Sequence, residues 1–175
     1  METIIKKITH TEEDKKIYEQ AGQILREGGL VAFPTETVYG LGADALDAKA
    51  SAKIYAAKGR PSDNPLIVHI CDKGQIKDIA EEIPESAKKI IDNFMPGPVT
   101  IILKKKSVVP NDVTAGLDTV AIRFPLHETA QKLIKAAGVP IAAPSANLSG
   151  KPSPTKAKHV VKAVSYTHLT LPTKL

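Results

Sequence analysis

Apolar residues recur at helical spacing in the first part of the chain. Between Ile17 and Leu25 they repeat every three or four positions, which predicts an amphipathic helix. Residues 11–14 resemble a capping box, with Asp in place of the usual Glu, and are predicted to begin this helix. Gly28 and Gly29 are predicted to end it, because glycine readily adopts the left-handed conformation that closes a helix.

The rest of the chain alternates short apolar runs with further helical patterns. Strands are predicted at residues 30–33, 66–70, 99–103, 119–124 and 140–143, and helices at residues 47–58, 73–80, 85–94 and 128–137 and from Ser153-Pro154 onward. Asp47 is the predicted N-cap of the helix that Gly59 ends. This order mixes β-α-β units with hairpin-like neighbours. We therefore expect an α/β fold with an open mixed sheet and flanking helices, rather than a barrel or a bundle.

Composition indicates one globular domain. The 175 residues are 42% hydrophobic and 25% charged, which excludes a disordered or fibrous protein. No apolar run approaches the ~20 residues of a membrane span, and the first residues carry no export signal. The single cysteine, Cys71, has no partner for an internal disulfide and is interpreted as a buried thiol. These features predict a cytoplasmic protein.

The net charge narrows the class of partner. A formal charge of +5 favours a polyanion, either a nucleotide or RNA, but does not select between them. Aromatic residues make up only 4% of the chain and Trp is absent, so a stacking platform for single-stranded nucleic acid is poorly supplied.

A polar loop follows the strand predicted at residues 30–33, at the strand end where α/β proteins collect ligand-binding groups. It offers hydroxyl groups and one carboxylate, from Thr35, Glu36, Thr37 and Tyr39. Gly40 and Gly42 are predicted to let backbone N–H groups approach a ligand. A polar turn without function is the equally supported alternative.

Two cations and a hydroxyl group, from Lys58, Arg60 and Ser62, lie at the junction between a predicted helix and a predicted strand. Arg offers bidentate hydrogen bonds and Lys a mobile charge, which together suit a phosphate. The alternative is that Lys58 only offsets the dipole at a helix C-terminus. Neither a Walker A segment nor a Gly-x-Gly-x-x-Gly motif is present, so a known glycine-rich phosphate loop is excluded.

Strand alternation makes one face of the predicted sheet partly polar. His69 lies opposite Leu66 and Val68 on its strand, while Thr119 and Arg123 share a face of theirs. A structural histidine and an edge-strand charge are the alternatives to a site. The five histidines of the chain show no metal-ligand spacing.

Small residues surround two polar positions after the strand predicted at residues 140–143. Ser145 and Asn147 alternate in this segment, which has more polar groups than packing requires. No Gly-x-Ser-x-Gly elbow is present, and the sequence places no base beside Ser145. We interpret these side chains as ligand-binding groups and not as nucleophiles, with simple packing as the alternative.

Several of these segments, taken in order, resemble one protein family. Residues 33–42, 58–66, 95–100, 120–125 and 143–150 are similar to the Sua5/YrdC/YwlC family of threonylcarbamoyl-AMP synthases, within a resemblance that spans about residues 5–163. The resemblance implies a YrdC-like open twisted sheet with a central basic groove. It also implies a nucleotidyltransferase that joins L-threonine, bicarbonate and ATP into threonylcarbamoyl-AMP and pyrophosphate, for the threonylcarbamoyladenosine modification of tRNA.

The resemblance also assigns residues by position. Thr35, His69 and Arg123 match the L-threonine site. The nucleotide site is matched by Lys58, Arg60, Ser62, Thr119, Ser145, Asn147 and Ser153, with Lys58 and Arg60 as the catalytic pair. Mg²⁺ is expected to arrive with ATP, and no protein metal site is expected. The implied partners are downstream threonylcarbamoyl-transferase proteins and a tRNA or double-stranded RNA.

Two other functions stay open on the sequence. A non-catalytic RNA-binding or ribosome-associated module would use the same basic groove, although RNA affinity alone does not require the threonine-type residues. The YrdC-like part of a carbamoyl-transferring hydrogenase maturation factor is less favoured. Such a domain lies in a much longer chain, with acylphosphatase and zinc-binding modules that are not found in this sequence.

The last residues depart from the family pattern. Family domains continue into further strands and a Gly-rich segment, and long members add another domain. Residues 164–175 continue neither the helix before them nor this pattern, and residues 164–169 resemble a translated sequencing adaptor. We expect a YrdC-like domain at residues 1–163, incomplete at its C-terminal end, and a non-native tail at residues 164–175. A natural divergent terminus is the alternative.

Removal of residues 164–175 is expected to leave the melting temperature nearly unchanged, because a foreign tail would not contribute to the core. A family-like continuation is expected to raise it, since an incomplete sheet leaves an unpaired edge. Thermal unfolding followed by circular dichroism compares the three chains. A large fall on removal of the tail would show that it is a packed part of the structure.

Overall fold

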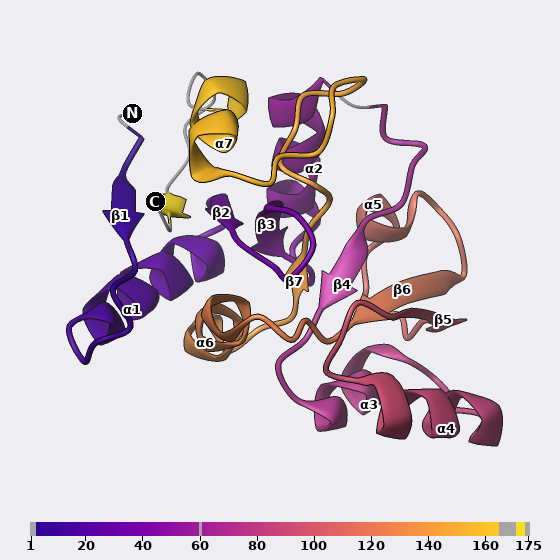
Figure 1. Cartoon of the computed structure of the whole chain (residues 1–175). Helices are drawn as coiled ribbons and strands as arrows, with labels where there is room; N and C mark the ends of the chain where they lie inside the picture. The colour runs from indigo at the N-terminus through magenta and orange to yellow at the C-terminus, as the bar shows by residue number, and fades with distance from the viewer. Residues whose placement is uncertain (1–2, 60, 165–170, 174–175) are drawn as a thin grey trace.

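A mixed six-stranded sheet lies at the centre of the part of the chain that the structure describes (Figure 1). The structure is a computed structural model, and it describes residues 3–59, 61–164 and 171–173. In spatial order, the strands are β2 (Val31–Phe33), β3 (Gly40–Asp44), β7 (Ile141–Ala142), β4 (Ile67–His69), β6 (Thr119–Arg123) and β5 (Thr100–Lys104). β4 and β6 run parallel, and the other neighbouring strands are antiparallel.

Helices pack against both faces of this sheet (Figure 1). They are α1 (Asp14–Arg26), α2 (Ala48–Lys58), α3 (Ile76–Ile79) with a preceding 3₁₀ turn (Lys73–Gln75), α4 (Glu85–Phe94), α5 (Asn111–Thr114), α6 (Glu128–Ala137) and α7 (Ala157–Val164). Two further strands, β1 (Ile5–Lys7) and β8 (Leu171–Thr173), form a separate parallel pair. Within the described ranges, no helix combines the length and the apolar character needed to cross a membrane.

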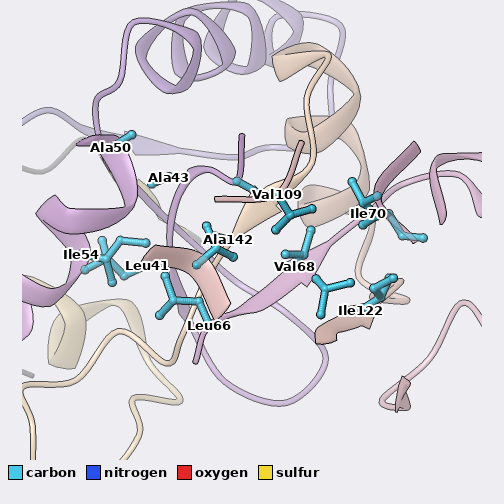
Figure 2. Close-up of a cluster of buried hydrophobic side chains, with 14 of the residues drawn as sticks. Leu41, Ala43, Ala50, Ile54, Leu66, Val68, Ile70, Val109, Ile122 and Ala142 are labelled. Carbon is cyan, nitrogen blue, oxygen red and sulfur yellow. The ribbon is translucent and has the colours of Figure 1, made fainter. Parts of the chain in front are cut away.

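One face of the sheet is buried from β3 to β5. The backbone register aligns a row of apolar side chains across these strands: Ala43, Ala142, Val68, Ile122 and Ile101. Figure 2 shows Ala142, Val68 and Ile122 in one cluster with residues of α2. Burial of this row holds the register, because a slip of one residue would turn every apolar side chain to the other face.

The opposite face is covered over only part of its width. The neighbouring row of the register joins Ile141, His69, Arg123 and Thr100. α1 and α6 pack over its first part, where Phe33 and Ile141 are fully buried. Beyond His69 the cover ends, so that Arg123 is partly exposed and Thr100 is exposed. This face of the sheet is therefore buried under α1 and α6 at one end and open to solvent at β6 and β5.

The α/β fold with an open mixed sheet is confirmed, and so are several element boundaries. α4 and α6 have the predicted bounds. The Asp47 carboxylate caps α2 as predicted, accepting hydrogen bonds from the backbone N–H of Lys49 at 2.8 Å and of Ala50 at 3.2 Å. Gly59 ends this helix at a φ of 57°, in the left-handed region that glycine favours.

The capping box predicted at residues 11–14 is wrong. No side chain caps the backbone of α1 at its N-cap residue, Glu13. The Asp14 carboxylate instead faces backward and accepts hydrogen bonds from the backbone N–H of Thr9 at 3.0 Å and of His10 at 2.7 Å. Asp14 thus stabilises the turn before the helix and does not cap the first backbone N–H groups of the helix.

Two further predictions differ from the structure. The last helix begins at Ala157 and not at Ser153-Pro154, because the carbonyl of Pro154 accepts a hydrogen bond from Tyr39 N–H at 2.9 Å instead of one within a helix. Gly40 and Gly42 were assigned to a ligand-binding loop, but both lie in β3, which the sequence pattern missed. Their strand has no β-branched or aromatic side chain to reveal it.

Part of the predicted tail lies within the described residues. Leu171–Thr173 form β8, and Leu171 pairs with Ile5 of β1. Residues 165–170 and 174–175 lie outside the described residues. The expectation that residues 164–175 add no stability stays a prediction.

Replacement of Gly42 by Ala is expected to destabilise the fold, because the new Cβ would lie 2.7 Å from Ile141 and 2.8 Å from Phe33. Overpacking of this kind costs ~1–3 kcal/mol of the free energy of unfolding, measured by urea denaturation. Gly40→Ala in the same strand is the matched control, since its Cβ would meet Ala143 and Phe33 at an ordinary 3.4 Å. Equal losses in the two variants would contradict a packing role for Gly42.

Candidate functional site

The chain segments that follow β2 and β7 are joined by backbone hydrogen bonds. Tyr39 N–H donates to the carbonyl of Pro154 at 2.9 Å, and Leu41 N–H donates to that of Pro144 at 2.9 Å. In return, Ala146 N–H donates to the carbonyl of Tyr39 at 2.8 Å. Polar residues that are far apart in the sequence are therefore held in one region beside the sheet.

Arg123 is the centre of a first polar cluster, the Arg123 group, which comprises Thr35, Glu36, Thr37, His69 and Arg123. Its Nη2 lies 2.9 Å from the Glu36 carboxylate and donates a hydrogen bond to Thr37 Oγ1 at 3.2 Å. The hydroxyl groups of Thr35 and Thr37 are 3.1 Å apart. The structure thus brings the predicted threonine-site residues Thr35 and Arg123 together through Thr37.

His69 lies beside Arg123 in the parallel register of β4 and β6. Its side chain is buried, with Nδ1 at 3.1 Å from the carbonyl of Ile67 and the ring edge against Phe33. Burial, and then the positive charge of Arg123, lower the pKa of His69 from 6.5 to about 4. His69 is therefore neutral near pH 7 and adds no charge to the site.

Glu36 is a member of this group that the sequence-based site assignment missed. Burial alone would raise the pKa of its carboxyl group, but the hydrogen bond and charge of Arg123, together with backbone N–H groups, hold the pKa below its ordinary value. Glu36 is therefore ionised and forms an ion pair with Arg123. The polar loop indicated a carboxylate in this region, but no sequence spacing identified its partner.

Lys58 is the centre of a second cluster, the Lys58 group, formed with Ser145, Asn147 and Ser149. Its side chain is buried, and its Nζ donates hydrogen bonds to the carbonyls of Ser145 and Asn147. Ser145 Oγ donates to Asn147 Oδ1 at 2.5 Å, and Ser149 N–H donates to the carbonyl of Lys58 at 3.0 Å. Lys58 thus places a positive charge beside the loop after β7, and its hydrogen bonds also stabilise the conformation of that loop.

A cavity of about 550 Å³ lies next to the loop after β2. It is lined by Pro34, Thr35, Tyr39, His127, Thr155, Lys156, Ala157 and Lys158. His127 is the N-cap residue of α6, and its Nδ1 accepts a hydrogen bond from Thr129 N–H at 3.2 Å. The sequence analysis did not select His127, Lys156 or Lys158, although lysines recur from residue 151 to 162 without an acidic residue.

The remaining predicted site residues lie outside these two clusters. Within the described part of the chain, no side-chain hydrogen bond joins Thr119, Ser62 or Ser153 to either cluster. Thr119 begins β6 on the same face as Arg123, while Ser62 lies in an exposed turn and Ser153 in an exposed segment. Arg60 lies outside the described residues, so its predicted role stays a prediction.

The described residues include no group of three or more His, Cys, Asp or Glu side chains that could hold a metal ion. The Mg²⁺ expected with ATP stays a prediction. The arrangement offers three kinds of chemistry: an oriented guanidinium for a carboxylate, a buried ammonium, and several hydroxyl groups as donors and acceptors.

Comparison with known proteins gives consistent matches. A family model described as Sua5_yciO_yrdC, telomere recombination, matches residues 23–171. The threonylcarbamoyl-AMP synthase of Pyrococcus abyssi is 58% identical over 160 residues, or 91% of this chain and 47% of that protein. The threonylcarbamoyl-AMP synthase of Bacillus subtilis is 61% identical over 142 residues, or 81% of this chain and 41% of that protein. The chain thus spans less than half the length of these two relatives.

Solved structures agree with these matches. Pyrococcus abyssi Sua5 complexed with L-threonine superposes with a TM-score of 0.92 and 49% identity, over 99% of this chain and 51% of that one. Escherichia coli YciO superposes with a TM-score of 0.83 over 98% of this chain and 84% of that one. Its identity of 23% supports a shared fold alone.

The neutral state of His69 predicts a pH dependence of stability. The folded-state pKa of about 4 lies below the ordinary 6.5, so the unfolded chain binds a proton first as pH falls. The free energy of unfolding should be highest above pH 6.5 and fall by ~1.4 kcal/mol per pH unit toward pH 4, or ~3 kcal/mol in all.

Urea denaturation at several pH values measures this slope. His69→Asn should lose it between pH 6.5 and 5, even if the variant is less stable overall. The exposed His159, replaced in the same way, is the control and should keep the slope of the unchanged protein. An unchanged slope in His69→Asn would contradict the buried neutral state.

Proposed function

The chain belongs to the Sua5/YciO/YrdC family, and from this membership we propose that it is the substrate-binding part of a threonylcarbamoyl-AMP synthase. Two relatives of the chain, those of Pyrococcus abyssi and Bacillus subtilis, are threonylcarbamoyl-AMP synthases, which supports the proposal. The complex of Pyrococcus abyssi Sua5 with L-threonine supports it as well. The observation that carries it is that Arg123 contacts the segment after β2 and Lys58 contacts the segment after β7, while backbone hydrogen bonds join these two segments.

L-Threonine binds in this proposal at the Arg123 group. The guanidinium of Arg123 receives the substrate carboxylate, since planar N–H pairs match the two carboxylate oxygens. Thr35 offers a hydroxyl group to the amino-acid backbone. Neutral His69 supplies a hydrogen-bonding ring without adding a second positive charge. The combination suits a small polar zwitterion better than a continuous phosphate backbone.

ATP binds in this proposal at the Lys58 group. Lys58 and Arg60 offset negative charge on the phosphates, and Ser145 and Asn147 belong to the same group. Ser62, Thr119 and Ser153, which no side-chain hydrogen bond joins to this group among the described residues, are assigned to the nucleotide by the family resemblance alone. Mg²⁺, bound to the ATP phosphates, would supply further charge neutralisation. In this proposal the carbonyl hydrogen bonds of Lys58 fix the position of its ammonium before the nucleotide binds.

The proposed reaction requires little covalent chemistry from the protein. The threonine amine attacks CO₂ derived from bicarbonate and loses a proton, which forms a carbamate. A carbamate oxygen then attacks the α-phosphorus of ATP, a P–O bond forms, and pyrophosphate leaves. The catalytic contribution is placement of the two substrates and stabilisation of charge on pyrophosphate. Downstream transferases would then move the threonylcarbamoyl group to tRNA in the cytoplasm.

The decisive experiment measures pyrophosphate release from ATP by this chain, with and without threonine and bicarbonate. Release that depends on both co-substrates is expected. Lys58→Ala should reduce the rate by roughly 10²-fold, the scale of losing one preorganised charge-stabilising group. Release that is independent of threonine would refute the proposal.

Lys53→Ala is the matched control for this variant. Lys53 lies on the same helix, and its Nζ also donates a hydrogen bond to a backbone carbonyl, that of Gly28 at 2.5 Å. Its loss should affect stability but not the threonine-dependent rate. Equal rate losses in the two variants would show that Lys58 acts only by supporting the fold.

A further inference from the structure

Glu36 and Arg123 form a largely buried ion pair, and the proposed reaction uses only one member of this pair, Arg123. The Arg123 side chain is 11% exposed and that of Glu36 is 19% exposed, whereas the exposed pair of Glu85 and Lys88 leaves 74% and 54% of its side chains in solvent. Removing two charges from water is costly unless geometry compensates for it. A pair this buried therefore calls for a physical reason to retain it.

The contacts of the guanidinium are concentrated on one nitrogen atom. Nη2 forms the ion pair with the Glu36 carboxylate at 2.9 Å, and it also donates a hydrogen bond to the Thr37 hydroxyl at 3.2 Å. Nε of the same side chain is buried and has no hydrogen-bond partner among the described residues. A buried donor without a partner costs free energy. Among the described residues, Nη1 of the same guanidinium also has no hydrogen-bond partner, and it is not enclosed as Nε is, so Nη1 is the donor that a ligand carboxylate can reach.

The charges around Arg123 also indicate that it can bind a ligand carboxylate. Glu36 is ionised, and the neighbouring His69 is neutral, so Arg123 is the charged member of the row Ile141, His69, Arg123 and Thr100. Glu36 compensates the guanidinium in the absence of substrate and fixes its plane from one side. Because a guanidinium has five N–H donors, one carboxylate on Nη2 leaves others for a second carboxylate.

We propose that Glu36 is a positioning residue for L-threonine, which holds the Arg123 guanidinium so that its remaining donors face the substrate carboxylate. This inference rests on the proposed function, because it takes Arg123 as the group that binds threonine. The competing explanation is that the pair only fastens the loop after β2 to the end of β6. The two explanations differ in how loss of the Glu36 charge changes the affinity for L-threonine and the affinity for ATP.

Calorimetric titration of the full chain with L-threonine and, separately, with ATP tests this role. In Glu36→Gln, which keeps the side-chain shape, the dissociation constant for threonine should rise at least ~10-fold, which corresponds to ~1.4 kcal/mol. The dissociation constant for ATP should stay within about twofold, because the Lys58 group is unchanged. Glu85→Gln, which removes the exposed ion pair on α4, should leave both constants unchanged.

L-Threoninamide, which lacks the carboxylate, provides a second measurement. It should bind the unchanged protein and Glu36→Gln with similar affinity, because Glu36 acts on the carboxylate through Arg123. If Glu36→Gln does not fold, Glu36→Asp replaces it. This shorter carboxylate keeps the charge but withdraws it from Nη2, and a weaker threonine affinity with normal ATP affinity is again expected.

Three results would overturn the inference. Threonine affinity could be unchanged in the variant, threonine and ATP affinities could fall together, or threoninamide could lose as much affinity as threonine. A failure of the unchanged protein to bind threonine would instead refute the proposed function, and this inference with it. The unchanged protein therefore distinguishes the two failures.

Discussion

The register of the central sheet is held by its buried face, where Ala142, Val68 and Ile122 lie in one row. A slip of one residue would expose this row, so hydrophobic burial tolerates only one alignment. The same alignment places His69 next to Arg123 on the opposite face. The positions of polar groups in the site thus follow from apolar packing on the far side of the sheet.

The second constraint is the incomplete cover of that opposite face. α1 and α6 bury Phe33 and Ile141, and the cover ends at His69. A site at the edge of a core has a low local dielectric, which strengthens charge interactions and penalises unpaired charges. This explains why His69 is neutral and why Arg123 has a carboxylate partner within the protein.

The chain segments after β2 and β7 connect this edge to the Lys58 group. Their backbone hydrogen bonds place Tyr39 between Pro154 and Ala146, and Lys58 donates into the same segment at Ser145. A ligand that bridges the two clusters would therefore contact strand ends, a loop and a helix C-terminus at once. Such an arrangement suits a reaction that depends on the relative placement of two substrates.

The sequence alone determined the elements that rest on local patterns. The bounds of α4 and α6, the Asp47 cap and the shared face of Thr119 and Arg123 all follow from residue spacing, because side-chain direction repeats with the period of the backbone. The tertiary structure decided β3, the ion pair of Glu36 with Arg123 and the neutral state of His69. Each of these depends on partners far away in the sequence, and a local pattern records that a residue is buried or polar but not which residue it meets.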